Sequence, residues 1–107
     1  ENNIRIITMN QLTEDLGDTC DIIMEFASGK DLYLSIDIDV VDPVFAPATG
    51  YKEPGGLTSR QFLYLIQRMN KMKNLKAVDL VEINPVLDEK FGMITTKLGA
   101  KIVGELL

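Results

Sequence analysis

Short apolar runs rich in β-branched residues predict three strands along this chain. They cover residues 4–8, residues 32–37 and residues 77–83, the last ending before Asn84-Pro85. The run from residue 32 to 37 is apolar at positions that face both sides of a sheet, which is typical of a buried parallel strand.

Apolar residues at three- and four-residue spacing predict three helices. The first lies around residues 22–27, after a polar stretch, and Gly29 would end it. The second begins at a cap, Thr58 or Ser59, and runs to about Met72. The third covers residues 95–107. The residues expected to face inward are Phe62, Leu63, Ile66 and Met69 in the second helix, and Leu98, Ile102, Val103 and Leu106 in the third.

The order strand, helix, strand, long loop, helix, strand, helix predicts an α/β fold. Such alternation gives a mainly parallel sheet with helices packed on its faces. Three strands are few for a sheet whose two faces and two edges must be covered. The 107 residues show no repeat and no linker. We therefore expect part of a single, larger α/β domain.

Two carboxylates end the central strand. Asp37 and Asp39 stand two residues apart, and strand geometry would place both on one face of the sheet. Neighbouring anions repel each other and lose hydration, so they favour a cation between them, and their oxygens suit a hard metal. Open α/β sheets bind ligands at this carboxyl end. The alternative is a polar strand end whose carboxylates cap loop amides.

Three further acidic residues flank these strands. Glu82 lies near the carboxyl end of the third strand, so it is expected close to Asp37 and Asp39, where it could bind a planar guanidinium. A structural pairing with a lysine would explain Glu82 equally well. Asp42 before Pro43 is typical of a turn, and Asp79 would be a structural residue at the other end of its strand.

Composition narrows the classes of function. There is no histidine, so any chemistry must use carboxylates, hydroxyls, lysines and backbone, or be completed from outside this chain. The net charge of −5 argues against nucleic-acid binding. No apolar run is long enough for a membrane span, and no signal peptide opens the chain. The single Cys20 fits a reducing, cytoplasmic location.

Several ordered motifs resemble the ureohydrolase family, the arginases, agmatinases and their relatives. Ser35-Ile36-Asp37-Ile38-Asp39-Val40-Val41-Asp42-Pro43 is similar to the family's Ser-x-Asp-x-Asp-x-x-Asp-Pro signature. It is followed by Ala46-Pro47-Ala48-Thr49-Gly50, by Gly55-Gly56-Leu57, and by Glu82-Ile83-Asn84-Pro85, each of which resembles a family element. The resemblance implies that residues 1–107 are the C-terminal half of a single ureohydrolase domain with a three-layer α/β/α arginase-like fold.

The resemblance also implies a set of roles. Asp37 would bridge two Mn²⁺ ions, Asp39 would bind one of them, and Glu82 would hold a small guanidino substrate. The family hydrolyses agmatine or arginine to an amine and urea with a metal-bridging hydroxide, in polyamine or arginine metabolism. Arginases carry a residue matching Arg60 near a subunit interface, so the complete protein is expected to be a homo-oligomer.

Some family motifs are absent from this chain. The Gly-Gly-Asp-His and Asp-Ala-His-x-Asp segments, which supply further metal ligands upstream, do not occur, and Tyr51 replaces a usual threonine. No catalytic residue is therefore expected within residues 1–107. The chain alone should bind manganese poorly and release no urea. Two alternatives stay open: a non-catalytic truncated domain or assembly module, and a family member acting on another guanidino or formimino substrate.

Overall fold

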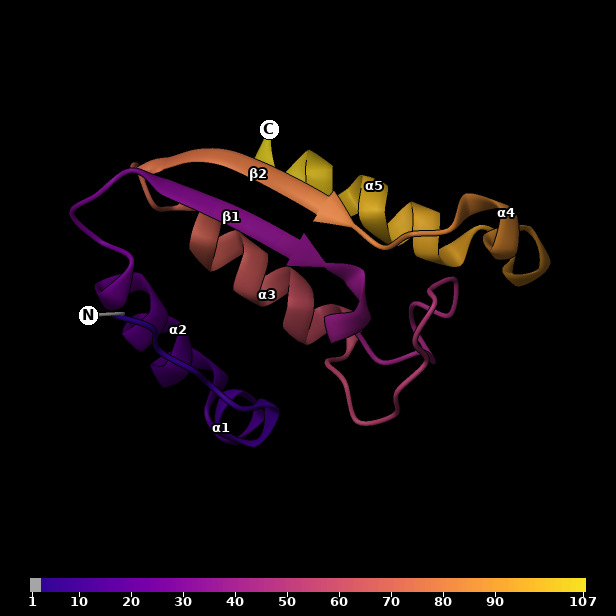
Figure 1. Ribbon diagram of the computed structural model, residues 1–107, viewed down its shortest axis with the longest axis horizontal. Helices are drawn as coiled ribbons and strands as arrows, with labels where there is room; N and C mark the ends of the chain where they lie inside the picture. The colour runs from indigo at the N-terminus through magenta and orange to yellow at the C-terminus, as the bar shows by residue number, and fades with distance from the viewer. Residues whose placement is uncertain (1–2) are drawn as a thin grey trace.

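The computed structural model describes residues 3–107 as helices packed on a small sheet (Figure 1). The elements are α1 (Met9–Glu14), α2 (Leu16–Phe26), β1 (Leu32–Asp37), α3 (Ser59–Asn70), β2 (Leu75–Val81), α4 (Pro85–Asp88) and α5 (Ile94–Leu106). Short 3₁₀ helices at Ile38–Val40 and Glu89–Phe91 follow β1 and α4. None of the helices in this described part has the length and apolar character needed to cross a membrane.

Strands β1 and β2 form a parallel pair with a single register over most of their length. Ile36 lies opposite Leu80, and Asp37 lies opposite Val81. The long loop and α3 connect the two strands, and parallel strands require a crossover of this kind. The predicted α/β class with a parallel sheet is therefore confirmed.

The core lies between the sheet and the two longest helices. Figure 1 shows α3 beside β1 and α5 behind β2, and these two helices contact each other. The apolar stripe predicted for α3 is buried as expected, and Thr58 caps the helix through a capping box with Gln61. On α5, Leu98, Ile102 and Leu106 face the core as predicted, whereas Val103 was predicted to face inward and is exposed. The buried cluster comprises Leu12, Ile36, Ile38, Val41, Ala46, Leu57, Phe62, Leu63, Ile66, Leu98 and Ile102.

The opposite face of the sheet is open, which corrects the expectation that β1 is buried on both sides. Tyr33, Ser35 and Asp37 point away from the helices and are exposed. On this face the hydroxyls of Tyr33 and Ser35 both donate to the Asp79 carboxylate. These two hydrogen bonds hold the pKa of Asp79 below its ordinary value. The bond between Tyr33 and Asp79 also raises the pKa of the Tyr33 hydroxyl. Asp79 thus lies opposite Ser35, within β2 rather than at its far end.

The strand predicted over residues 4–8 is wrong. These residues form no strand, because the described chain places no neighbouring strand beside them to accept their backbone hydrogen bonds. They lead into α1, which lies within the polar stretch and begins at Thr8 in a capping box with Gln11. The Thr-x-x-Gln spacing was the signal for this helix.

Three boundaries also differ from prediction. Helix α2 ends at Phe26, so Gly29, with φ of 84°, belongs to the following turn. Strand β2 begins at Leu75 rather than 77 and ends at Val81, before Glu82 turns the chain away. Backbone hydrogen bonds determine where each helix or strand ends, and the apolar pattern does not predict those ends to the exact residue.

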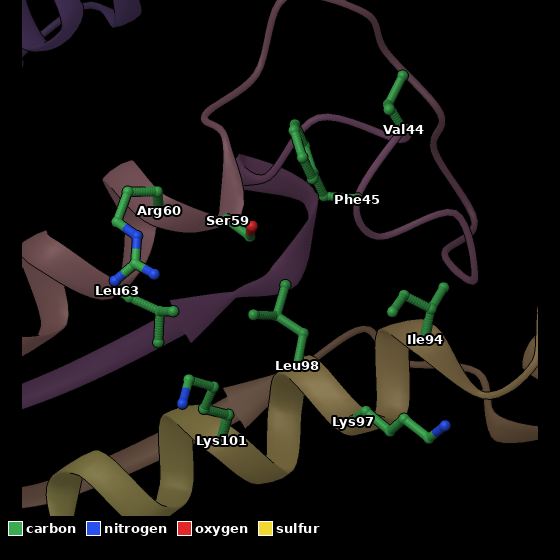
Figure 2. A pocket seen from close by; sticks show the side chains of 9 residues that line it. All are labelled: Val44, Phe45, Ser59, Arg60, Leu63, Ile94, Lys97, Leu98 and Lys101. Carbon is green, nitrogen blue, oxygen red and sulfur yellow. The ribbon is translucent and has the colours of Figure 1, made fainter.

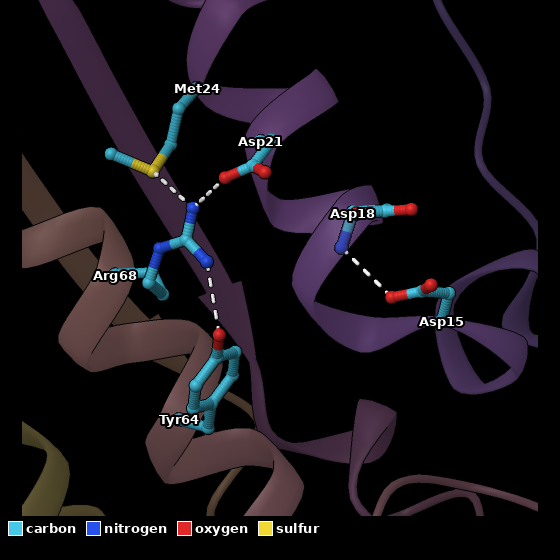
Figure 3. A network of polar contacts seen from close by, with 6 residues as sticks. All are labelled: Asp15, Asp18, Asp21, Met24, Tyr64 and Arg68. Carbon is cyan, nitrogen blue, oxygen red and sulfur yellow. Dashed lines mark hydrogen bonds and ion pairs between the residues drawn. The ribbon is translucent and has the colours of Figure 1, made fainter.

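Helix α2 is fixed to α3 by one arginine (Figure 3). The Arg68 guanidinium donates to the Asp21 carboxylate, to the Tyr64 hydroxyl at 3.0 Å and to the Met24 sulfur at 3.5 Å. These partners raise the pKa of Arg68, chiefly through Tyr64 and then Asp21. Cys20 is buried in α2, and burial raises the pKa of its thiol. It therefore behaves as a small apolar residue.

Candidate functional site

The two aspartates at the end of β1 are held by a turn. Asp37 is the last strand residue, and Asp39 lies in the 3₁₀ helix Ile38–Val40. The strand geometry expected for the pair is therefore wrong at Asp39. Instead, Asp37 Oδ1 accepts a hydrogen bond from the Asp39 backbone N–H at 2.9 Å. This bond fixes one carboxylate relative to the other, so the turn does the positioning that extended backbone was expected to do.

One oxygen of this pair lacks a partner. Asp39 Oδ1 is buried and accepts no hydrogen bond in the described chain. A buried carboxylate oxygen without a donor is costly, because it has lost its hydration and received nothing in return. A hard divalent cation would satisfy it. Within residues 3–107, however, no three Asp, Glu, Cys or His side chains gather closely enough to hold a metal ion. Asp37 and Asp39 thus fit part of a metal site.

Glu82 lies at the same edge of the sheet. Since Asp37 pairs with Val81, Glu82 follows directly after the residue opposite Asp37. Its φ of 74° is in the left-handed region, which costs a non-glycine residue about 1–3 kcal/mol. Its side chain is exposed at this edge, and no ion pair to a lysine is formed in the described chain. An unusual backbone that is not explained by a structural ion pair favours a binding role for Glu82.

Asp42 ties the long loop to the end of β1. Its carboxylate accepts hydrogen bonds from the backbone N–H groups of Val44 at 3.0 Å, Gly55 at 2.9 Å and Gly56 at 3.2 Å. The bonds from Val44 and Gly55 are the main reasons why the pKa of Asp42 lies below its ordinary value. The turn role predicted for Asp42 agrees with this geometry. The loop is therefore a defined wall next to the aspartate pair.

Gly56 is required for this closure. A Cβ at Gly56 would lie 2.6 Å from the Asp42 nitrogen and 2.9 Å from the Val40 carbonyl oxygen. Because both are backbone atoms, the clash cannot be relieved by a rotamer change. We expect Gly56→Ala to lower the free energy of unfolding by about 2 kcal/mol, as for other overpacked sites. Urea unfolding of the chain measures this loss.

Gly50→Ala is the matched control for this change. It lies in the same loop, and no heavy atom would lie within 4 Å of its Cβ. Equal stability of the two alanine variants would contradict the close approach of the loop to Asp42.

A second feature, a groove of about 520 Å³, lies away from the aspartate pair (Figure 2). Figure 2 shows Arg60 and Lys101 at one end of it, beside Leu63, whereas Lys97 points outward. This groove was not predicted from the sequence. The feature that could have indicated it was the spacing of Lys97 and Lys101, one turn apart on α5. Its lining residues are Val44, Phe45, Ser59, Arg60, Leu63, Ile94, Lys97, Leu98 and Lys101.

The described chain is an α/β protein whose carboxylates Asp37, Asp39 and Glu82 lie at the carboxyl edge of a parallel sheet, where open α/β sheets bind ligands. The sequence profile of the Arginase family matches residues 1–107, so the chain belongs to this family. The predicted resemblance to ureohydrolases is confirmed.

Individual relatives agree with this assignment. The chain is 41% identical over 105 residues to proclavaminate amidinohydrolase of Streptomyces clavuligerus, covering 97% of this chain and 33% of that protein. The solved structure of that enzyme superposes with a TM-score of 0.87 over 96% of this chain and 34% of its own. Agmatinase of Bacillus subtilis is 40% identical over 81 residues, covering 75% of this chain and 27% of that protein. The chain thus spans about a third of the length of these relatives.

Proposed function

We propose that this chain forms part of a dinuclear manganese ureohydrolase that cleaves a guanidino substrate to an amine and urea. The observation that carries the proposal is Asp39 Oδ1, a buried carboxylate oxygen without a donor at the carboxyl edge of the sheet. The Asp37 carboxylate, one turn away, keeps an oxygen that accepts no hydrogen bond in the described residues. Carboxylate oxygens arranged in this way suit Mn²⁺.

Each residue has a role in this proposal. Asp37 and Asp39 would both hold the metal ions through their carboxylate oxygens. Glu82 would accept two hydrogen bonds from the substrate guanidinium and orient its carbon toward the ions. When bound, the ions supply a water nucleophile that is active near neutral pH. The loop that is hydrogen-bonded to Asp42 would exclude bulk water from the position of the substrate. The remaining ligands would come from outside residues 1–107, since this chain has no histidine.

The substrate class is proposed from the chemistry of Glu82 and from the family. The relatives are named as acting on agmatine, arginine or proclavaminate-type substrates, and a structural neighbour is a formimidoylglutamase. We propose agmatine or arginine as substrate, with another guanidino or formimino compound as the second candidate. A cytoplasmic homo-oligomer is proposed for the complete protein: the single Cys20 fits a reducing location, and Arg60, which matches an interface residue of arginases, lies exposed at the groove.

The test uses the complete protein that carries this chain. After loading with Mn²⁺, urea release is measured with agmatine, arginine and other guanidino compounds, and formamide release with a formimino compound. Metal analysis should give two ions per subunit. Urea release from one guanidino compound supports the proposal. A complete protein that binds manganese yet acts only on the formimino compound favours the second candidate.

The complete protein separates the enzyme from a non-catalytic module, whereas the 107-residue chain by itself tests the division of the metal ligands. It should release no urea with Mn²⁺, because two aspartates supply only a minority of the ligands that two ions require. Turnover by the isolated chain would overturn the assigned division of ligands. A complete protein without manganese or turnover would instead identify the chain as part of an assembly module.

Glu82 offers a variant that separates backbone conformation from charge. Gly accepts a φ of 74° without strain, so Glu82→Gly should leave the free energy of unfolding unchanged or higher. Loss of the carboxylate should nevertheless lower kcat/KM of the complete protein by about a hundredfold, the equivalent of losing one bidentate charged contact. Urea unfolding and steady-state kinetics measure the two effects.

Glu53→Gln serves as the control for the Glu82 variant, since Glu53 is an exposed carboxylate on the nearby loop. It should change neither quantity. A fully active Glu82→Gly protein would remove Glu82 from substrate binding.

A further inference from the structure

Four residues from three separate segments close a ring of hydrogen bonds beside the proposed site. The Asn84 N–H donates to the Ala48 carbonyl at 2.9 Å, and the Ala48 N–H donates to the Thr95 hydroxyl oxygen at 3.0 Å. The Thr95 N–H donates to the Asp88 carboxylate at 3.3 Å, and the Asp88 N–H returns to the Asn84 carbonyl at 3.1 Å. We call this set, Ala48, Asn84, Asp88 and Thr95, the polar ring.

Three of the four residues of the polar ring are buried, and Asn84 is exposed. Ala48, Asp88 and Thr95 have no exposed surface. A buried N–H that loses its acceptor is not rescued by water. Thr95 supplies the acceptor for Ala48 with its side chain, whereas Asn84 and Asp88 join each other through the backbone. The Thr95 hydroxyl is therefore the side-chain contact that holds the loop to the first turn of α5.

The polar ring lies between the loop wall and the segment that carries Glu82. On one side Ala48 belongs to the loop that Asp42 clasps at Gly55 and Gly56. On the other side Asn84 follows Glu82 by two residues, after the left-handed turn. A strained conformation persists only where its surroundings determine it, and the bond from Asn84 to Ala48 supplies such a restraint. These hydrogen bonds thus fix the distance between the loop and the segment that carries Glu82.

We infer that Thr95 is a positioning residue: its hydroxyl fixes Ala48, and through Asn84 it fixes the place of Glu82 relative to the loop wall. This inference rests on the proposed function for its catalytic consequence. Thr95 touches no substrate in this account. It acts by keeping the carboxylate of Glu82 and the loop at the distance that a guanidinium fits, where small displacements strongly affect binding.

The test compares three variants of the complete protein. Thr95→Val removes the hydroxyl and keeps the shape, Thr95→Ser restores the hydroxyl, and Thr96→Val is the matched control. Thr96 is the next residue, and its buried hydroxyl has no hydrogen-bond partner in the described chain. We expect Thr95→Val to raise KM about tenfold with kcat nearly unchanged, since substrate placement is affected more than the reacting groups. Thr95→Ser and Thr96→Val should keep the wild-type KM.

Amide hydrogen exchange gives a readout that does not depend on activity. The Ala48 and Asn84 amides should exchange at least tenfold faster in Thr95→Val, and at wild-type rates in the other two variants. A Thr95→Val protein with lowered stability but unchanged KM and unchanged exchange at these amides would overturn the inference. If the wild-type protein hydrolysed no guanidino compound, the proposed function would fail. The exchange rates of Ala48 and Asn84 would then still decide whether Thr95 holds the loop.

Discussion

Replacing Asp39 by asparagine in the complete protein is expected to abolish tight manganese binding and to lower kcat about a thousandfold. The amide has one oxygen and no charge, so the buried position that lacks a donor would lose most of its attraction for a cation. A loss of this size corresponds to about 4 kcal/mol of transition-state stabilisation, the scale of metal-ion catalysis. Metal analysis after dialysis and the urea assay measure both effects.

Asp31→Asn is the control for this experiment. Asp31 is an exposed aspartate immediately before β1, so the change in charge is the same and the fold context is similar. It should keep two manganese ions and wild-type turnover. Retention of both ions by the Asp39→Asn protein would show that Asp39 is not a ligand and would favour the polar strand end as its explanation.

The second large effect is expected at Asp88. Its carboxylate has no exposed surface, and it accepts hydrogen bonds from the N–H groups of Thr95 at 3.3 Å and Thr96 at 2.7 Å. These are donors of the first turn of α5, whose own N-cap residue, Met93, offers no side-chain cap. Asp88→Ala leaves both donors buried without acceptors and should lower the free energy of unfolding by about 3 kcal/mol. Urea unfolding of the 107-residue chain measures this change.

The pH dependence of the same variant gives a second check. Burial raises the pKa of Asp88, but the hydrogen bonds from Thr96 and Thr95 outweigh it and hold the pKa below the ordinary value of 3.8. The folded state therefore favours the carboxylate. Its contribution is complete above about pH 3.8 and is lost as the pH falls through the lower folded pKa. The difference between wild type and Asp88→Ala should shrink in that acidic range.

Glu89→Ala is the control for Asp88→Ala, because Glu89 is an exposed neighbour in the following 3₁₀ helix. It should unfold at nearly the wild-type urea concentration at every pH. A loss at Asp88 that stayed constant throughout the acidic range in which the chain remains folded would assign its effect to the cavity rather than to the carboxylate.

Elements that bury a regular apolar stripe could be predicted from the sequence. The stripe of α3 and the apolar run of β1 both appear where the periodicity placed them. The segment at residues 4–8 had the composition of a strand but not a partner strand, and pairing is what defines a strand. Helix α1 was missed because its polar surface hides the period, although its capping box was readable.

The position of the proposed site residues at the sheet edge could be predicted from the sequence, and the details of their geometry could not. Asp37, Asp39 and Glu82 follow from their place at strand ends. The turn that orients Asp39 is local, because it is closed by Asp37 two residues earlier, but the apolar pattern of the strand conceals it. The left-handed backbone of Glu82 lies two residues before the bond from Asn84 to Ala48, a contact between distant residues that no local pattern encodes. The same holds for the polar ring, since Ala48 and Thr95 are 47 residues apart.

That separation has a consequence for how the protein is made. During synthesis the N-terminal part of a domain emerges first, and contacts between distant residues form late. The loop is released from the ribosome well before α5, so the Ala48 N–H has no hydroxyl to donate to until α5 has emerged. The strands and α3 can collapse earlier on their own apolar contacts. The loop is thus fixed to α5 only after the strands and α3 have been synthesised, and termination before Thr95 would leave the loop without this contact.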